Sequence, residues 1–356
     1  MLYILNLIFS CFYLSYIREE SNCGKLLLKV SPVIILWVII IGGQDNIGTD
    51  YNNYLAYFNY PFDEVRFEPL FVELSCLCYN IGIEGQGLFF VYAAINAIVI
   101  FIASYRLGIR HWAIFFFLFV TVSTFFNNQM NGLRQCTAVA LVYWAFVELY
   151  NSKIKGTALI LLATGFHYSS ITNIVFVLFK KVTEILTKFP KLLLVVTLFV
   201  SMLPTDDSIN SILIESIPDE LSEETEYERL YSNNQEMSEG VDIMVKLSKI
   251  LLIPIYWLSL YMLKDDRLTP KESIFFKFGL LSYSLRCVLL VNNLVGRFSY
   301  FFWIPSILPI YYLCVELQNR GKKLELIGIL LYCSVIYFYK VAMEIGEYKS
   351  SFIYFN

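Results

Sequence analysis

Long apolar stretches, separated by short polar segments, recur along almost the whole chain. A transmembrane helix needs about 20 consecutive, mostly apolar residues to cross the hydrocarbon core of a bilayer. Such stretches lie at 1–17, 26–43, 86–105, 112–126, 131–150, 189–204, 243–263, 273–292, 295–317 and 324–341. The pattern predicts an all-α fold, a polytopic transmembrane helical bundle of about ten spanning helices. Residues 1–356 are expected to form a single integral membrane domain.

Two further apolar segments do not read as complete spans. Residues 67–82 are short and contain Glu68 and Glu73, and residues 156–179 are interrupted by a polar stretch at 165–170. We expect both to be half-inserted or re-entrant helical elements. Irregular backbone at membrane depth is tolerated only where it lines a polar or water-filled cavity. The two breaks therefore indicate a functional site that lines such a cavity.

Charge is distributed unevenly between the polar segments. Lys and Arg gather in the short segments 106–110, 153–155, 180–191 and 319–323. Short basic loops of this kind stay on the cytoplasmic side of a membrane. Residues 205–242 instead carry twelve acidic residues against the single base Arg229. We expect them to form an extracytoplasmic acidic loop between spans.

Composition supports a lipid environment and argues against nucleic-acid binding and metal binding. Hydrophobic residues make up 57% of the chain, and the mean hydropathy of +0.60 is far from that of a water-soluble domain. The net charge of −3 gives no reason to expect a nucleic-acid partner. The chain has no C-x-x-C pair and no metal-ligand spacing among its Cys, His and acidic residues, so the sequence predicts no metal and no cofactor.

Carboxylates follow the second apolar stretch, in a polar patch that includes Asp50 and Tyr54, and Glu68 stands before Pro69. Partial desolvation at a membrane boundary can raise the pKa of a carboxyl group toward the range of a general acid or base. A structural role is an equally good explanation for each carboxylate, since Asp50 lies in a predicted turn and Glu68 lies at a predicted helix start. Both roles stay open.

Arginines stand just inside the predicted helices at two places. Arg134 is followed by Gln135, and Arg297 is followed by Tyr300; Arg286 is a third arginine within an apolar stretch. Charge inside a membrane is unfavourable and usually faces a cavity or a counter-ion. An anionic phosphate or carboxylate ligand is therefore expected, with extension of the side chain to the interface as the alternative.

His167 occupies the break in the interrupted segment, with Ser169 two residues on. A histidine among apolar residues is often a hydrogen-bonded core residue, but one at a helix break at membrane depth is a candidate for proton transfer. The other histidine, His111, lies in a basic loop. We therefore place His167 among the candidate catalytic residues.

Five short motifs occur in order along the chain: Gly48-x-Asp50-x-x-x-Tyr54, Glu68, Arg134-Gln135-x-x-Ala138, His167-x-Ser169 and Arg297-x-x-Tyr300. This constellation resembles the EpsG family of Wzy-like polysaccharide polymerases. The resemblance implies a multi-pass enzyme of the bacterial plasma (inner) membrane, a glycosyltransferase that joins undecaprenyl-diphosphate-linked oligosaccharide repeats into capsule, exopolysaccharide or O-antigen. It also implies a chain-length regulator and a flippase of the same pathway as partners.

The resemblance implies roles for the candidate residues. Arg134 and Arg297 would bind the departing diphosphate. The remaining substrate-binding candidates are polar groups beside these residues or beside His167, namely Gln135, Tyr54, Tyr300 and Ser169. The base that deprotonates the acceptor hydroxyl would be Asp50, His167 or Glu68, and the sequence leaves this choice open.

Three alternatives need the same polar residues. A transporter or flippase for the lipid-linked sugar would also use membrane-embedded arginines and broken helices. The two halves of such a protein should be related by an internal repeat, which the sequence does not show. A membrane O-acyltransferase would use the histidine to activate a hydroxyl group. A non-catalytic scaffold would not explain why arginines are embedded in the membrane.

Overall fold

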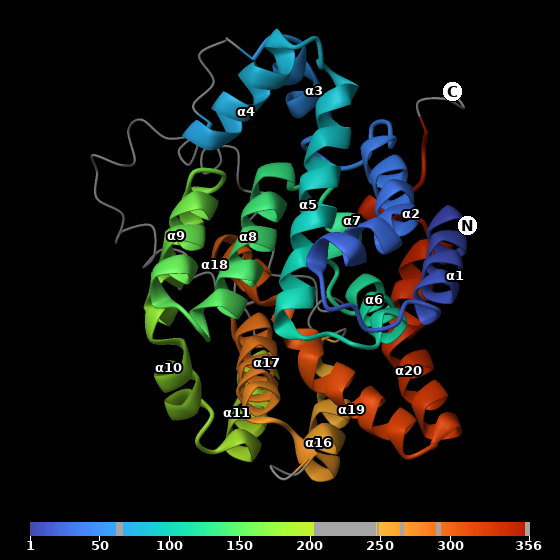
Figure 1. The fold of residues 1–356 in the computed structure, drawn as a ribbon, viewed down its shortest axis with the longest axis vertical. Coiled ribbons are helices and arrows are strands. Elements are labelled where there is room, and N and C mark those ends of the chain that lie inside the picture. Colours follow the sequence, from blue (N-terminus) through green and yellow to red (C-terminus); the bar gives the residue numbers. More distant parts are fainter. Residues whose placement is uncertain (62–66, 203–246, 248, 264–266, 290–292, 353–356) are drawn as a thin grey trace.

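The computed structural model describes residues 1–61, 67–202, 247, 249–263, 267–289 and 293–352, and within them the chain is helical throughout (Figure 1). No strand occurs in this part of the chain, where the only β contact is an isolated antiparallel bridge between Gln44 and Phe352. The predicted all-α class is thus confirmed. The predicted acidic loop at 205–242 lies outside the described residues.

The first half of the chain forms a group of packed helices. They are α1 (Leu2–Ser15), α2 (Cys23–Gly42), α3 (Tyr51–Asn59), α4 (Pro69–Asn80), α5 (Gln86–Leu107), α6 (Trp112–Thr121), α7 (Phe125–Asn128), α8 (Leu133–Leu149) and α9 (Lys153–Thr164). Helix α5 packs between α2 and α8, and α9 packs against the other side of α8 (Figure 1).

The second half begins with a bent segment. Its helices are η1 (Tyr168–Leu178), α10 (Phe179–Leu186), α11 (Pro190–Met202), α16 (Ile253–Met262), α17 (Pro270–Val288), α18 (Asn293–Phe298), η3 (Ser299–Phe302), η4 (Pro305–Ile307), α19 (Leu308–Asn319), α20 (Lys323–Ala342) and η5 (Gly346–Tyr348). Helix α17 packs on α11, η3 and η4, while α19 packs on α6, α16 and α20.

Fewer helices meet the requirements of a membrane span than the sequence predicts. Among the described residues, α2, α5 and α20 are long and apolar enough to cross, and two bent pairs raise the number to five if each pair is one span. The predicted count of about ten is not confirmed. Helix α4 has twelve residues, a length of about 18 Å, which is too short for a hydrocarbon core of about 30 Å.

One predicted span, 112–126, extends past the end of the observed helix. Thr124 has the left-handed φ of 67°, which an α-helix of L-residues does not continue through. Arg286 of α17, almost completely buried, donates to the carbonyl oxygens of Val122 at 2.9 Å and Ser123 at 3.1 Å. The arginine therefore satisfies the backbone carbonyl groups at this break.

A second predicted span, 295–317, is divided. The segments Gly296–Phe302 and Pro305–Asn319 are inclined to one another by 57°, and Pro305 lacks the N–H that a continuous helix needs. The predicted interruption within 156–179 is confirmed, since residues 165–167 separate α9 from η1. After η1 and α10, the chain bends by 95° into α11.

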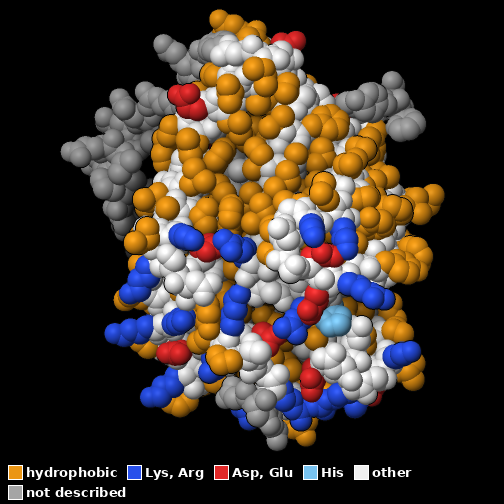
Figure 2. Space-filling model, in the orientation of Figure 1, with side chains coloured by type: hydrophobic (Ala, Val, Ile, Leu, Met, Phe, Trp, Pro, Cys, Tyr) orange, Lys and Arg blue, Asp and Glu red, His pale blue; other side chains and the backbone are white. Residues whose placement is uncertain are grey.

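The charged side chains gather at one end of the helices. Arg106, near the end of α5, pairs with Glu148 at the end of α8, with 3.2 Å between Nε and Oε1, and Lys271 donates to the carbonyl oxygen of Arg106 at 2.6 Å. Arg110 and Arg267 line one pocket nearby. We call this the basic end; Figure 2 shows that most charged side chains on this face lie in the lower half of the molecule, below a largely apolar surface.

Candidate functional site

The candidate site lies at the opposite ends of α5 and α8 from the basic end. Here α3, the start of α4, the start of α8 and the break after α9 meet, because the amide of Leu70 donates to the carbonyl oxygen of Gly165 at 2.9 Å. A Cβ atom on Gly165 would lie 2.5 Å from the Leu70 side chain. Only glycine therefore lets the break approach α4 so closely.

Glu68 is the centre of the site. Its side chain is buried, and Arg134 donates from Nη1 to Oε2 at 2.6 Å. His167 Nδ1 lies 2.9 Å from Oε1, and the amide of Tyr168 donates to the same oxygen at 3.4 Å. Three of the residues singled out from the sequence, from three different helix ends, thus meet at one carboxylate.

Arg134 is held on several sides. Its Nε donates to the hydroxyl of Tyr54 at 3.4 Å, and its guanidinium carbon lies 4.4 Å from the centre of the Phe67 ring, a favourable cation–π position. The sequence suggested an external anion as its partner, and the structure supplies an internal one, Glu68. The side chain nevertheless keeps 18% of its surface exposed.

The surroundings of Glu68 also set its ionisation. Burial raises the pKa of the carboxyl group, but the hydrogen bond with His167 and the positive charge of Arg134 outweigh burial and hold the pKa below its ordinary value. Glu68 is therefore ionised at neutral pH and is a weak base. This environment suits a group that orients its neighbours better than one that accepts the proton of a substrate.

The lowered pKa of Glu68 predicts a pH-dependent stability. An unfolded glutamate titrates near pH ~4.3, so the ionised Glu68 stabilises the fold above that pH, and this contribution is lost as the pH falls through the lower pKa of the folded state. We expect the difference in melting temperature between wild type and Glu68→Gln to be largest at neutral pH and to shrink in acid. The control is Glu84→Gln, which replaces an exposed carboxylate.

Asp50 is linked to the same helix start through the backbone. The side-chain oxygen of Asn131 accepts hydrogen bonds from the amide and hydroxyl of Thr49, both at 2.8 Å, and from the amide of Asp50 at 3.3 Å. Gly48 has a φ of 91°, which brings the loop against Asn131. Asp50 is thereby placed beside α8.

Arg297 and Tyr300 form a second group beside α8. Gln135 donates from Nε2 to the carbonyl oxygen of Arg297 at 3.2 Å, and the Tyr300 ring stacks on Trp303 with centroids 4.1 Å apart. Arg297 is partly buried, and its guanidinium makes no ion pair with any residue that the structure describes. Ser169, in η1, has a buried hydroxyl without a hydrogen-bond partner there.

The C-terminal segment contributes contacts that the sequence did not reveal. Ser351 donates from its amide to the side chain of Gln44 at 2.9 Å and accepts from the amide of Asp45 at 2.8 Å. The Tyr3 hydroxyl donates to the carbonyl oxygen of Lys349 at 2.5 Å. These backbone contacts between distant segments support the loop that carries Asp50, and no residue pattern could have indicated them.

Neighbouring side chains complete the support of that loop. Tyr51 donates to Gln86 at 2.6 Å, and Gln86 donates to the carbonyl oxygens of Gly42 and Gln44. No group of three His, Cys, Asp or Glu residues able to hold a metal ion gathers in the described ranges. The site is thus built from one buried ion pair, one histidine and one arginine outside that pair.

Comparison with known proteins identifies a protein family. The sequence model described as the EpsG family matches residues 26–355. No curated protein and no solved structure matches the chain.

Proposed function

Because the chain belongs to the EpsG family, the family of Wzy-like exopolysaccharide polymerases, we propose that it joins lipid-linked oligosaccharide repeats into a longer glycan. It is a polysaccharide polymerase-like membrane protein. The proposed reaction is glycosyl transfer from an undecaprenyl-diphosphate donor at the outer face of the bacterial plasma membrane. The product would be capsule, exopolysaccharide or O-antigen.

The position of the Glu68 cluster is the observation that carries this proposal. Arg134 lies at the start of α8, whereas Glu148, near its other end, pairs with Arg106 of the basic end. Basic loops stay in the cytoplasm, so the cluster would face outward, where the donor is presented. A buried carboxylate holding both an arginine and a histidine suits proton and phosphate chemistry better than it suits a scaffold.

Arg134 and Arg297 would both bind the diphosphate, in different ways. A guanidinium has five N–H donors, and Arg134 uses two of them for Glu68 and Tyr54. The others are available to a phosphate oxygen on its exposed side. Arg297, outside that pair, would supply the net positive charge for the leaving group. Donors fixed before the reaction stabilise developing charge most effectively.

His167 is the residue that we propose as the general base. With Nδ1 turned toward Glu68, its Nε2 is left to accept a proton. The acceptor hydroxyl would give its proton to Nε2 as its oxygen attacks the anomeric carbon with inversion. The bond from that carbon to the diphosphate breaks, and the diphosphate leaves. Glu68 would act as a positioning residue that orients the imidazole.

Replacement of His167 by alanine is expected to lower the rate of chain extension by about 10²- to 10⁴-fold, the usual contribution of a general base. The rate is measured by gel analysis of the length of the glycan that the purified variant makes. His111→Ala is the matched control, because His111 is the chain's other histidine and lies at the start of α6 beside the basic end. Equal loss in both variants would contradict a specific role for His167.

The function itself is tested by incubating purified protein with a synthetic undecaprenyl-diphosphate-linked repeat. A ladder of products that differ by one repeat is expected. Movement of the lipid-linked sugar between leaflets without extension would instead favour a flippase. Acylation of the repeat would favour an O-acyltransferase. Either of these results, with no ladder from folded protein, would overturn the proposal.

A further inference from the structure

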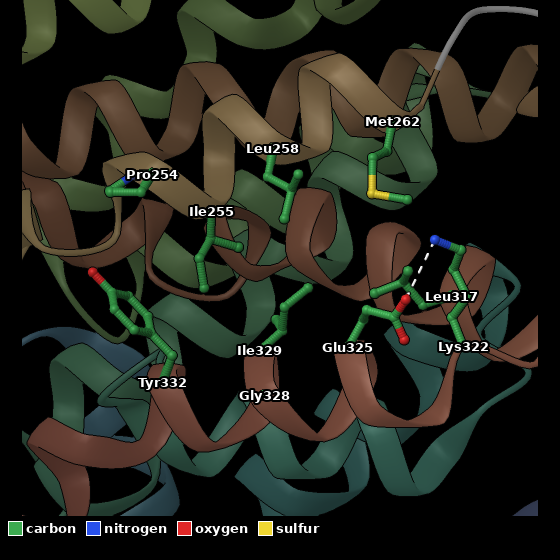
Figure 3. A pocket seen from close by; sticks show the side chains of 10 residues that line it. All are labelled: Pro254, Ile255, Leu258, Met262, Leu317, Lys322, Glu325, Gly328, Ile329 and Tyr332. Carbon is green, nitrogen blue, oxygen red and sulfur yellow. Dashed lines mark ion pairs between the residues drawn. The ribbon is translucent and has the colours of Figure 1, made fainter.

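An apolar groove opens between α16 and α20 near the basic end, with α19 at its side (Figure 3). Its volume is about 460 Å³. Most of the side chains that line it are apolar: Pro254, Ile255, Leu258, Met262, Leu317 and Ile329. The groove lies outside the Glu68 site and is independent of the function proposed there.

Gly328 lines this groove from within α20. A glycine in a helix interior destabilises the helix by about 1 kcal/mol relative to alanine. Apart from the adjacent backbone of α20, a Cβ atom at this position would meet no atom of the described chain within 4 Å. The missing side chain therefore creates space that the described chain does not fill, and α20 retains it despite the loss of helix stability.

The surroundings of Gly328 distinguish between occupants. Closely packed membrane helices usually repeat a small residue four positions away. Here the positions four residues before and after Gly328 are Leu324 and Tyr332. A second helix would be kept away by these large side chains. A single flexible hydrocarbon chain needs no such repeat, and it fits a groove with walls from two helices.

The two ends of the groove differ in chemistry. Lys322 lies at one end, where its Nζ is 3.3 Å from Glu325 Oε1. At the other end the Tyr332 hydroxyl donates to the carbonyl oxygen of Leu251 at 2.6 Å. Figure 3 shows this arrangement, with Lys322 and Tyr332 at opposite ends. The groove thus has a lysine at its opening and, at its other end, a tyrosine whose hydroxyl is bound to the backbone.

The length of the groove matches one leaflet of a bilayer. Ten residues separate Lys322 from Tyr332, a distance of about 15 Å along α20 at the helical rise per residue. The hydrocarbon core is about 30 Å thick, so half of it is the depth that one leaflet's acyl chains occupy. A lipid with its headgroup at Lys322 would place one chain along the whole groove.

The charge at the opening suits an anionic headgroup. Lys322 is about half exposed, and Lys323 follows it at an exposed position. Arg320 and Arg267, near by, both pair with Glu316. Among the described residues at this opening, Lys322 and Lys323 carry two positive charges and Glu325 carries one negative charge, while Arg320 and Arg267 share Glu316. A phosphate group would therefore meet a net positive opening.

We propose that this groove binds one acyl chain of an anionic glycerophospholipid from the leaflet at the basic end, with its phosphate at Lys322. The lipid fills the space beside Gly328 and links α16 to α20. Its phosphate adds to the ion pair between Lys322 and Glu325. Under the orientation given above, this leaflet faces the cytoplasm, so the site is separate from a donor bound at the outer face.

The test uses the full-length chain, stripped of lipid in detergent, with phosphatidylglycerol and phosphatidylcholine as probes. Native mass spectrometry is expected to show preferential retention of phosphatidylglycerol by wild type. Gly328→Leu places a side chain in the groove at a position where a Cβ atom has open space, and it should weaken retention about tenfold or more, since each CH₂ excluded removes about 0.8 kcal/mol. Lys322→Gln should remove the preference between the two lipids.

Controls separate the groove from general lipid contact. Val335 is exposed on α20 and does not line the groove, so Val335→Leu should retain phosphatidylglycerol as wild type does. Thermal unfolding establishes that each variant is folded. Equal retention of the two lipids by wild type, unchanged retention by Gly328→Leu, or a dimer that Gly328→Leu disrupts would each overturn the proposal. The last result would assign the groove to a second copy of the chain.

Discussion

Alanine in place of Arg134 is expected to lower the free energy of unfolding by about 3–5 kcal/mol, the usual effect of removing one partner from a buried ion pair. Glu68 would keep its charge in a buried position, where His167 and the amide of Tyr168 are its remaining hydrogen-bond partners in the described part of the chain. The change also removes the cation that packs on Phe67. Loss of chain extension is expected together with this loss of stability.

Thermal or denaturant unfolding in detergent measures the effect. Lys29→Ala is the control, because Lys29 pairs with Glu20 while about half of its side chain is exposed, and such pairs contribute about 0–1 kcal/mol. The double variant Glu68→Gln with Arg134→Ala should be more stable than Arg134→Ala, since no charge is then stranded. Unchanged stability of Arg134→Ala would show that Glu68 does not depend on this partner.

Arg297→Ala is expected to lower the rate of chain extension by about 10²- to 10³-fold while leaving the protein folded. This is the typical loss when one preorganised donor to a developing negative charge is removed. Stability should change little, because Arg297 takes part in no ion pair among the described residues and its hydrogen bond with Gln135 uses the backbone carbonyl group. A lysine at this position keeps the charge and should retain part of the activity.

Glycan length and unfolding temperature, measured on the same preparations, separate the two arginines. Arg134→Ala should lose both stability and activity, whereas Arg297→Ala should lose activity alone. Normal glycan length in Arg297→Ala would remove the diphosphate role of that residue. A large loss of stability in Arg297→Ala would instead assign it a structural role.

The sequence by itself predicted features that depend on local properties. The apolar runs predicted as helices are helical at 23–42, 86–107 and 323–342. The length of an apolar run and its tendency to form a helix both depend on residues that are neighbours in the sequence. The break before His167 was predicted for the same reason, since a polar stretch interrupts an apolar one. The family resemblance also rested on short motifs whose order along the chain is visible without any structure.

The predicted span at 112–126 differs from the observed helix because a distant residue intervenes. The apolar run at 112–126 contains no proline or glycine, and its polar residues are only serine and threonine. The observed break depends on Arg286, more than 160 positions away, which supplies the hydrogen bonds that the backbone of Val122 and Ser123 would otherwise lack. Composition within a window cannot reveal a partner that another helix brings to it.

Only the tertiary structure decided which candidate residues act together. Glu68, Arg134 and His167 were each singled out from the sequence, but their pairing across 66 and 99 positions depends on how α4, α8 and the break after α9 pack. A charge in a membrane protein can find its partner on any neighbouring helix, and burial makes that choice energetically large. The residue types are therefore local information, whereas the pairing that lowers the pKa of Glu68 and turns His167 toward it is set by helix packing.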